Sequence, residues 1–213
     1  MLTGMIDTIS EYIIVGLIVS SALYLLYLIV YFFVYKKLLH GKKALNLRKA
    51  LIINIFVVYI FLVLYATMFA RFSGITGGIN LELFISYKKA LFRLSSSAWR
   101  DITLNIFMFV PFGFLLPLLS KFFYKPYFTI ILSFLFTLSI ETVQLIIKIG
   151  AFDLDDIFNN VLGAIMGYCL VMSLLSSGFN KERNKKKYSF IYTVPLIIIT
   201  LVFLGFYIFC NFK

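Results

Sequence analysis

The chain has 213 residues, of which 62% are hydrophobic and only 14% are charged, and its mean hydropathy is +1.00. A soluble domain has about 45–50% apolar and about 25% charged residues, so this composition excludes a single soluble globular domain. The apolar runs are unbroken and about 20 residues long, which suits a membrane-spanning helix and not the alternating strands of a membrane β-barrel. The sequence therefore predicts an all-α, polytopic transmembrane helical bundle.

The formal net charge of +11 comes mostly from lysines in loops between the apolar runs. Attraction of these loops to an anionic membrane face explains the charge, so we expect no nucleic-acid partner. Cys169 and Cys210 lie inside apolar runs without CxxC spacing, and the single histidine, His40, lies in a basic loop. These residues predict neither a disulfide nor a multi-histidine metal site, and no cofactor is expected. The oligomeric state stays open.

Six apolar segments are expected to cross the membrane, at residues 12–35, 50–70, 101–120, 127–147, 157–177 and 190–209. The third contains Pro111, Gly113 and Pro117. Because proline removes a backbone donor, this span is expected to be kinked or broken. If the third segment is instead re-entrant, five spans remain.

The longest connection between spans is residues 71–100. Its second half has apolar residues at roughly helical spacing, with Lys88, Lys89 and Arg93 between them. This pattern favours an interfacial amphipathic helix near residues 80–95. An ordinary solvated loop is the alternative.

Most of the 20 lysines and arginines lie in the loops at residues 36–49, 121–126 and 178–189. The positive-inside rule places these basic loops in the cytoplasm and both termini outside. We therefore expect a multi-pass protein of the cell membrane, with membrane lipids as its first partners.

Four polar residues from three consecutive spans are expected at a similar depth. With a helical rise of about 1.5 Å per residue, Asn105, Gln144 and Asn160 lie about 6 Å below the outer surface, and Glu141 lies about 10 Å below it. Glu141 and Gln144 are three residues apart, so they share one face of their helix. The sequence therefore predicts an outward-opening polar pocket at this level.

Five charged residues flank this expected pocket, namely Arg100, Asp101, Asp153, Asp155 and Asp156. A lone acid at the depth of Glu141 must be protonated, hydrated or paired, and Arg100 and Arg93 are the candidate partners. The three later acids precede a helix, so capping of its free N–H groups is an alternative role for them.

Some of these residues also have a packing interpretation. Asn105 and Asn160 suit hydrogen bonds between helices, which contribute about 0.6 kcal/mol each. Gly163 and Gly167 form a GxxxG pattern that favours close helix packing. Pro111, Gly113 and Pro117 shape the backbone.

Three motifs occur in order along residues 100–168. They are an Asn before a Phe-x-Pro-Phe-Gly-Phe run, a Glu-x-x-Gln pair, and an Asp-x-Asp-Asp stretch followed by Asn and two glycines. The matching residues are Asn105, Phe109, Pro111, Phe112, Gly113, Glu141, Gln144, Asp153, Asp155, Asp156, Asn160, Gly163 and Gly167. In these motifs the chain resembles the VanZ-like family of bacterial membrane proteins, over about residues 71–175. Many members place an arginine before the acidic stretch, where this chain has Lys148.

The family's namesake confers resistance to the lipoglycopeptide teicoplanin. The resemblance therefore implies a VanZ-like core at residues 71–177, preceded by two spans in residues 1–70 and followed by a basic loop and a last span in residues 178–213. The first hypothesis for function is a non-enzymatic protein that lowers susceptibility to such a drug, with an outward-facing acidic pocket that binds the lipoglycopeptide or a lipid-linked cell-wall intermediate.

Two other functions stay open. In an intramembrane enzyme that acts on a lipid head group, Glu141 would be the general acid or base, and Asp155 and Asp156 would hold Mg²⁺. No activated Ser or Cys supports this reading. The third hypothesis is a lipid or small-molecule transporter or scramblase, although the chain shows no internal repeat.

Overall fold

The computed structural model describes residues 21–22, 24–26, 28–38, 40, 46–69, 78–179 and 197. The chain divides into two units, Met1–Phe69 and Ala70–Lys213, and each is described by itself. The span expected at residues 12–35 lies partly outside the described residues, and the span expected at residues 190–209 lies almost entirely outside them.

Among the described residues of the first unit, the longest helix is α2 (Leu47–Leu64). A π-helical stretch covers Val30–Leu38, and α2 continues as a π-helical turn at Tyr65–Phe69. The side chain of Asn46 caps the start of α2. The helix α2 and most of the π-helical turn after it form a segment, Leu47–Met68, that is long and apolar enough to cross a membrane.

Over residues 78–179, the second unit contains three long helices, one short helix, a 3₁₀ turn and two very short strands. In chain order they are β1 (Ile79–Asn80), α3 (Ile85–Phe92), α4 (Ser96–Leu119), the 3₁₀ turn (Lys121–Tyr124), α5 (Pro126–Ile146), β2 (Phe152–Asp153) and α6 (Leu154–Phe179). Like α2, the helices α4, α5 and α6 are long and apolar enough to cross a membrane. The prediction of an all-α polytopic bundle is confirmed, and the two-residue strands are a small addition to it.

Two helix starts differ from their expected positions. The Ser95 side chain accepts the N–H of Ala98, so α4 begins at Ser96 and places Arg100 and Asp101 inside the helix. Similarly, α6 begins at Leu154, which places Asp155 and Asp156 in its first turn. The helix α4 runs continuously through Pro111 and Pro117 instead of breaking there.

The helices α4 and α6 make the closest contact in the second unit, and glycines on both sides permit it. A Cβ atom added at Gly113 would lie 1.8 Å from the carbonyl oxygen of Ala164. At Gly163 it would lie 2.0 Å from the oxygen of Ile106, and at Gly167 it would lie 1.9 Å from the oxygen of Val110. Any larger side chain at these positions would force the two backbones apart.

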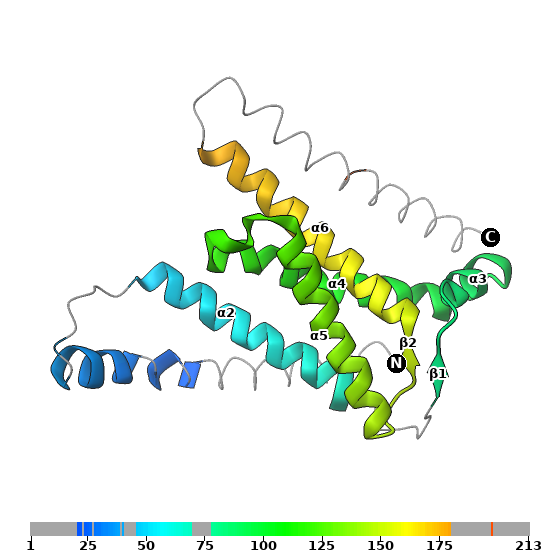
Figure 1. Cartoon of the computed structure of the whole chain (residues 1–213), viewed down its shortest axis with the longest axis horizontal. Coiled ribbons are helices and arrows are strands. Elements are labelled where there is room, and N and C mark those ends of the chain that lie inside the picture. Colours follow the sequence, from blue (N-terminus) through cyan, green and yellow to red (C-terminus); the bar gives the residue numbers. More distant parts are fainter. Residues whose placement is uncertain are drawn as a thin grey trace, which may run out of the picture. The chain divides into compact units, whose positions relative to one another are not determined.

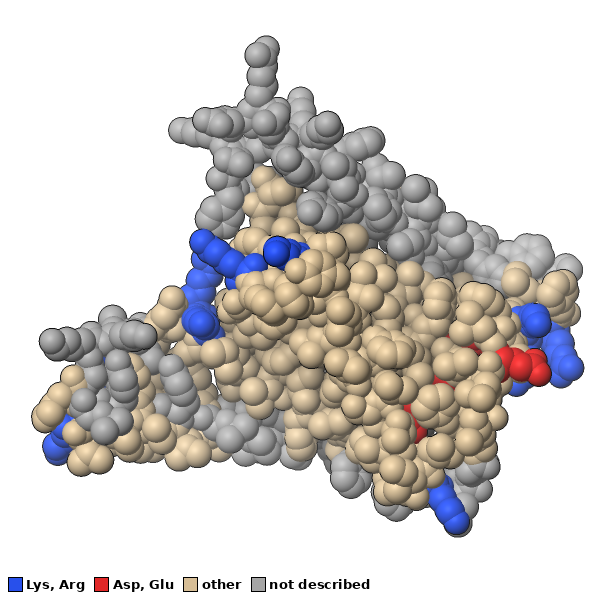
Figure 2. All heavy atoms as spheres, in the orientation of Figure 1, with Lys and Arg blue, Asp and Glu red and all other residues tan. Residues whose placement is uncertain are grey.

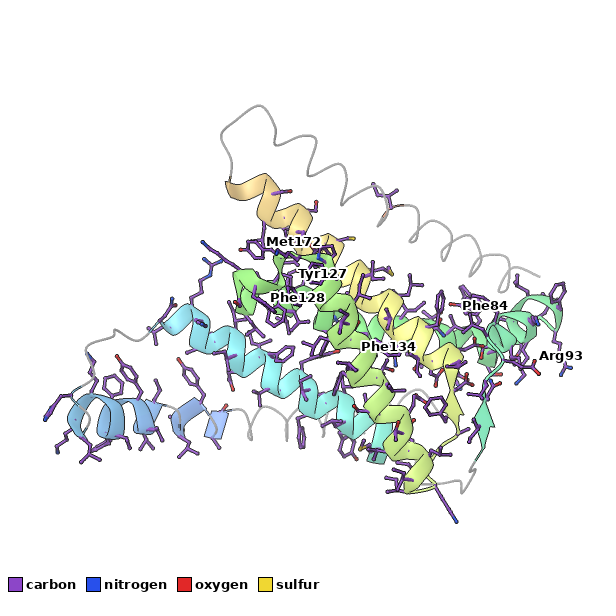
Figure 3. All side chains as sticks on the ribbon, viewed as in Figure 1. Phe84, Arg93, Tyr127, Phe128, Phe134 and Met172 are labelled. Carbon is purple, nitrogen blue, oxygen red and sulfur yellow. The ribbon has the colours of Figure 1, made fainter. Side chains whose placement is uncertain are left out.

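The short helix α3 packs against α4 and α6. Its Ala90 is fully buried, in a cluster with Trp99, Ile102 and Ile106 of α4 and Met166 of α6. The helix is shorter than the amphipathic segment expected near residues 80–95. Figure 3 shows Phe84 beside the start of α6 and Arg93 at the opposite end of α3.

Candidate functional site

Two short strands bring the segment before α3 onto the loop that joins α5 to α6. The strands are parallel, with Ile79 opposite Phe152 and Asn80 opposite Asp153, and they lie side by side in Figure 1. The N–H of Phe152 donates to the carbonyl oxygen of Gly78 at 2.9 Å. The side-chain amide of Asn80 also donates to Asp153 Oδ2 at 3.1 Å. Residues 78–92 therefore form a strap held at the start of α6.

The acids Asp153 and Asp155 accept backbone N–H groups. Asp153 Oδ1 accepts the N–H of Asp155 at 2.8 Å, which caps α6. Asp155 is fully buried, and its two oxygens accept the N–H groups of Phe84 at 2.5 Å and of Ser86 at 2.7 Å. Phe84 precedes α3 and offers no capping side chain of its own. Asp155 therefore caps α3 and not the helix to which it belongs.

Tyr87 and Asn159 add a second attachment of the strap to α6. The Tyr87 hydroxyl donates to Asn159 Oδ1, and Asn159 is fully buried. The ring of Phe158 packs edge-on against Phe84 and Tyr87, at centroid distances of 5.4 and 6.4 Å. Burial, followed by the negative charge of Asp155, raises the pKa of Tyr87 to about 12.

Asn105 of α4 meets Asp156 of α6 at the same end of the bundle. The Asn105 Nδ2 donates to Asp156 Oδ1 at 2.5 Å, and Asn105 is 6% exposed. A hydrogen bond to a carboxylate is stronger than one between neutral groups, so it stabilises the Asp156 side chain. This hydrogen bond links α4 to α6, the two most closely packed helices, at the end of the bundle where their polar residues lie.

The end of α5 supplies Glu141 and Gln144, which are both buried. Glu141 Oε2 accepts the N–H of Asp153 at 3.0 Å, so the acid also holds the loop before α6. One helical turn deeper, Asn160 Nδ2 of α6 donates to the hydroxyl of Thr137 at 2.7 Å. The structure therefore joins Asn105 to Asp156 and Glu141 to Asp153 in this polar cluster, while Asn160 bonds to Thr137 and Gln144 is buried on the same helix as Glu141.

Arg100 and Asp101 do not join this cluster. Their side chains are 66% and 60% exposed, and they pair with each other at 3.5 Å. Arg100, one of the two candidate partners of Glu141, therefore pairs with Asp101 at the outside of α4. Lys148 is exposed in the turn after α5, where its φ of 57° is left-handed. In Figure 2, acidic atoms show only in the right-hand part of the face drawn.

The sequence analysis missed Asn80, Tyr87, Asn159 and Thr137 as members of the cluster. The adjacent asparagines in an otherwise apolar helix start were a usable signal, because a buried carboxamide needs partners. Asn80, with Leu81 and Phe84, matches a VanZ-like Asn-Leu-x-Pro-Phe element incompletely, whereas no local pattern pointed to Tyr87. The hydrogen-bond partners of Asn80 and Tyr87 lie more than 70 residues away.

The arrangement is rich in hydrogen-bond acceptors. Both oxygens of Asp155 already accept backbone N–H groups, so they are poorly placed to hold a cation such as Mg²⁺. Within residues 21–179, as far as they are described, no group of three or more His, Cys, Asp or Glu is placed to hold a metal. The chemistry that the cluster suits best is recognition of donor groups, such as ammonium or amide N–H.

The family model described as VanZ/LLP1 matches residues 56–176. Protein VanZ of Enterococcus faecium is 37% identical over 92 residues, which cover 42% of this chain and 52% of that protein. The chain thus matches about half the length of this curated relative, and no solved structure matches it. Because the family match covers more than half of the sequence, the chain belongs to the VanZ/LLP1 family.

Proposed function

We propose that this protein lowers susceptibility to teicoplanin-class lipoglycopeptides. The observation that carries the proposal is the family match over residues 56–176, together with the similarity to Protein VanZ. The proposed route is binding of the drug, or of a lipid-linked cell-wall intermediate, at the polar cluster that joins the ends of α4, α5 and α6. No covalent step is required of the protein.

The chemistry of the cluster supports this choice of ligand. Glu141 and Asp156 offer carboxylate oxygens, and Asn105 and Gln144 offer carboxamides, all at the same end of three long apolar helices. Lipoglycopeptides carry cationic and amide donors on a lipid anchor, so acceptors at a membrane surface complement them. In this proposal, Asp153 and Asp155 hold the strap and the helix ends, and Glu141 and Asp156 contact the ligand.

The strap supplies an apolar surface beside the cluster. Phe92 is 84% exposed, and Leu91 and Leu94 beside it are also exposed. Lys88 and Lys89 are exposed on the same short helix. Apolar residues with interspersed lysines suit the boundary between head groups and acyl chains, where a drug's lipid anchor would lie.

The proposed orientation places this end of the bundle outside the cell. The turn between α4 and α5 carries Lys121 and Lys125, and the positive-inside rule assigns such a basic turn to the cytoplasm. The cluster is at the opposite end of both helices. A binder of an extracellular drug must present its acceptors on that outer face.

A susceptibility titration in a sensitive Gram-positive host tests the function. The host would express the wild-type chain, with teicoplanin and vancomycin titrated in parallel. We expect protection against teicoplanin, whose lipid tail anchors it near the membrane, and little protection against vancomycin. The proposal would be contradicted if the protein is found in the membrane fraction and yet expressing and non-expressing cells are equally susceptible to each drug.

A further inference from the structure

The helix α5 carries a buried line of polar side chains along most of its length. Thr129, Ser133 and Thr137 are 0% exposed, Glu141 is 2% exposed and Gln144 is 1% exposed. With 3.6 residues per turn, these five positions fall within an arc of about 120°. A helix long and apolar enough to cross a membrane thus turns its hydroxyl, carboxyl and carboxamide groups inward.

The line faces α6, which presents polar groups at two levels. Near the α5–α6 loop, Asn160 donates to Thr137, and Glu141 accepts the N–H of Asp153. Near the start of α5, the Tyr168 hydroxyl donates to the carbonyl oxygen of Tyr124 at 2.5 Å. Between these levels lie Thr129 and Ser133. At the α5–α6 interface, polar contacts of α6 and of the residue before it therefore lie near both ends of α5, and the buried hydroxyls of Thr129 and Ser133 lie between them along that helix.

Two buried atoms on this interface have no hydrogen-bond partner among the described residues. They are the hydroxyl oxygen of Thr129 and Oδ1 of Asn160, on side chains that are 0% and 2% exposed. Leaving such an atom unpaired costs about 1–3 kcal/mol, and buried polar atoms without protein partners usually bind ordered water. The two atoms lie on opposite sides of the same interface.

The spacing of the hydroxyls suits bridging water. Residues four apart on a helix are about 6 Å apart along its axis, which is too far for a direct hydrogen bond. A single water that bonds to both oxygens at about 2.8 Å spans up to about 5.6 Å, which is slightly less than this separation, so about two waters are needed between successive hydroxyls. Threonine hydroxyls both donate and accept, so Thr129 and Thr137 can continue such a chain. The Ser133 hydroxyl donates to the carbonyl oxygen of Ile130 at 2.9 Å, so it takes part as an acceptor.

We propose that a file of bound water molecules lies along the α5–α6 interface between Thr129 and Glu141. The file gives the Glu141 carboxyl contact with water from the end of the bundle that carries Lys121 and Lys125. Thr129, Ser133, Thr137 and Asn160 line it. The length from Thr129 to Glu141 is about 18 Å, more than half of a hydrocarbon core of about 30 Å. This inference does not depend on the drug response, because it concerns water alone.

Hydroxyl-radical footprinting of the full chain in lipid nanodiscs tests the proposal, with modified residues read by mass spectrometry. Radicals formed from water in place label only side chains close to water. Ile140 is 2% exposed and lies between Thr137 and Glu141, whereas Ile131 on the same helix is 53% exposed and faces outward. We expect Ile140 to be labelled several-fold faster than Ile131. Equal or slower labelling of Ile140 would overturn the proposal.

Matched variants separate a water file from polar helix packing. Thr137→Val removes a hydroxyl that faces α6, and Thr142→Val removes one that faces outward and bonds to Leu138 of its own helix. We expect Thr137→Val to lower the labelling of Ile140 to that of Ile131, and Thr142→Val to leave it unchanged. If Thr137→Val does not fold, Ser133→Ala and the outward-facing Ser139→Ala form a second pair with the same expectation. Unchanged Ile140 labelling in the inward-facing variant of a pair would also overturn the proposal.

Discussion

Asp155 of α6 accepts the backbone N–H of Ser86 at 2.7 Å, across 69 residues of chain. Its other oxygen accepts the N–H of Phe84, so a single buried carboxylate pairs with two N–H groups at the start of α3. The first N–H groups of a helix have no partners inside it, and a negative charge there also complements the helix dipole. The position of α3 therefore depends on a side chain from another helix.

Replacing this carboxylate should release the strap. Asp155→Ala leaves two N–H groups without their acceptor, and each such loss costs about 1–3 kcal/mol. We expect a lower unfolding temperature in detergent and faster proteolysis within residues 78–95. Asp101→Ala is the matched control, because its carboxylate is 60% exposed and should change neither quantity. Equal proteolysis of wild type and Asp155→Ala would contradict the capping role.

The stabilisation that Tyr87 contributes to the strap should depend on pH in the alkaline range. Burial and then the Asp155 charge raise the pKa of Tyr87 from 10.0 to about 12 in the folded chain. Because the folded state holds this proton more tightly, the stabilisation is complete below the unfolded pKa and is lost as the pH rises through about 12. The difference in unfolding temperature between wild type and Tyr87→Phe should therefore shrink across that window. A difference that stays constant as the pH rises through about 12 would show that ionisation of Tyr87 does not weaken the attachment of the strap.

The sequence predicted the long helices and the shared level of several polar residues for the same reason. Apolar runs set the span ends, and a constant rise per residue then fixes the depths of Asn105, Glu141 and Asn160. Close contact between α4 and α6 follows from small residues at GxxxG spacing. These inferences need only distances along one helix or between neighbouring helices.

The contacts of the strap could not be predicted in this way. Tyr87 meets Asn159, and Asn80 meets Asp153, across more than 70 residues, and nothing in the local pattern sets that register. Acids before a helix indicate capping, as Asp153 shows for α6, but no local rule says that Asp155 caps α3. The outward direction of Arg100 was missed because α4 begins earlier than the apolar run.

A methyl group added to α6 at the α4 contact should destabilise the bundle. In Gly163→Ala, the new Cβ would lie 2.0 Å from the carbonyl oxygen of Ile106, which is backbone and cannot rotate away. Overpacking of this kind costs about 1–3 kcal/mol. We expect a lower unfolding temperature and less protein in the membrane fraction. Gly150→Ala is the control, since its Cβ would meet Gln144 at an ordinary 3.5 Å. Similar unfolding temperatures for the two variants would refute the tight contact.

Two acids at the cluster should be needed for resistance but not for membrane insertion. Glu141→Gln and Asp156→Asn keep the size of each side chain and remove its charge, so a donor-bearing ligand loses a charge-assisted bond of about 1.5–3 kcal/mol. We expect teicoplanin susceptibility to return to that of cells without the protein, at an unchanged membrane level. Changing Lys185, Lys186 and Lys187 to Gln should preserve protection, because the proposed orientation puts them in the cytoplasm. Loss of protection in the lysine variant alone would mean that the ligand acts at the opposite face.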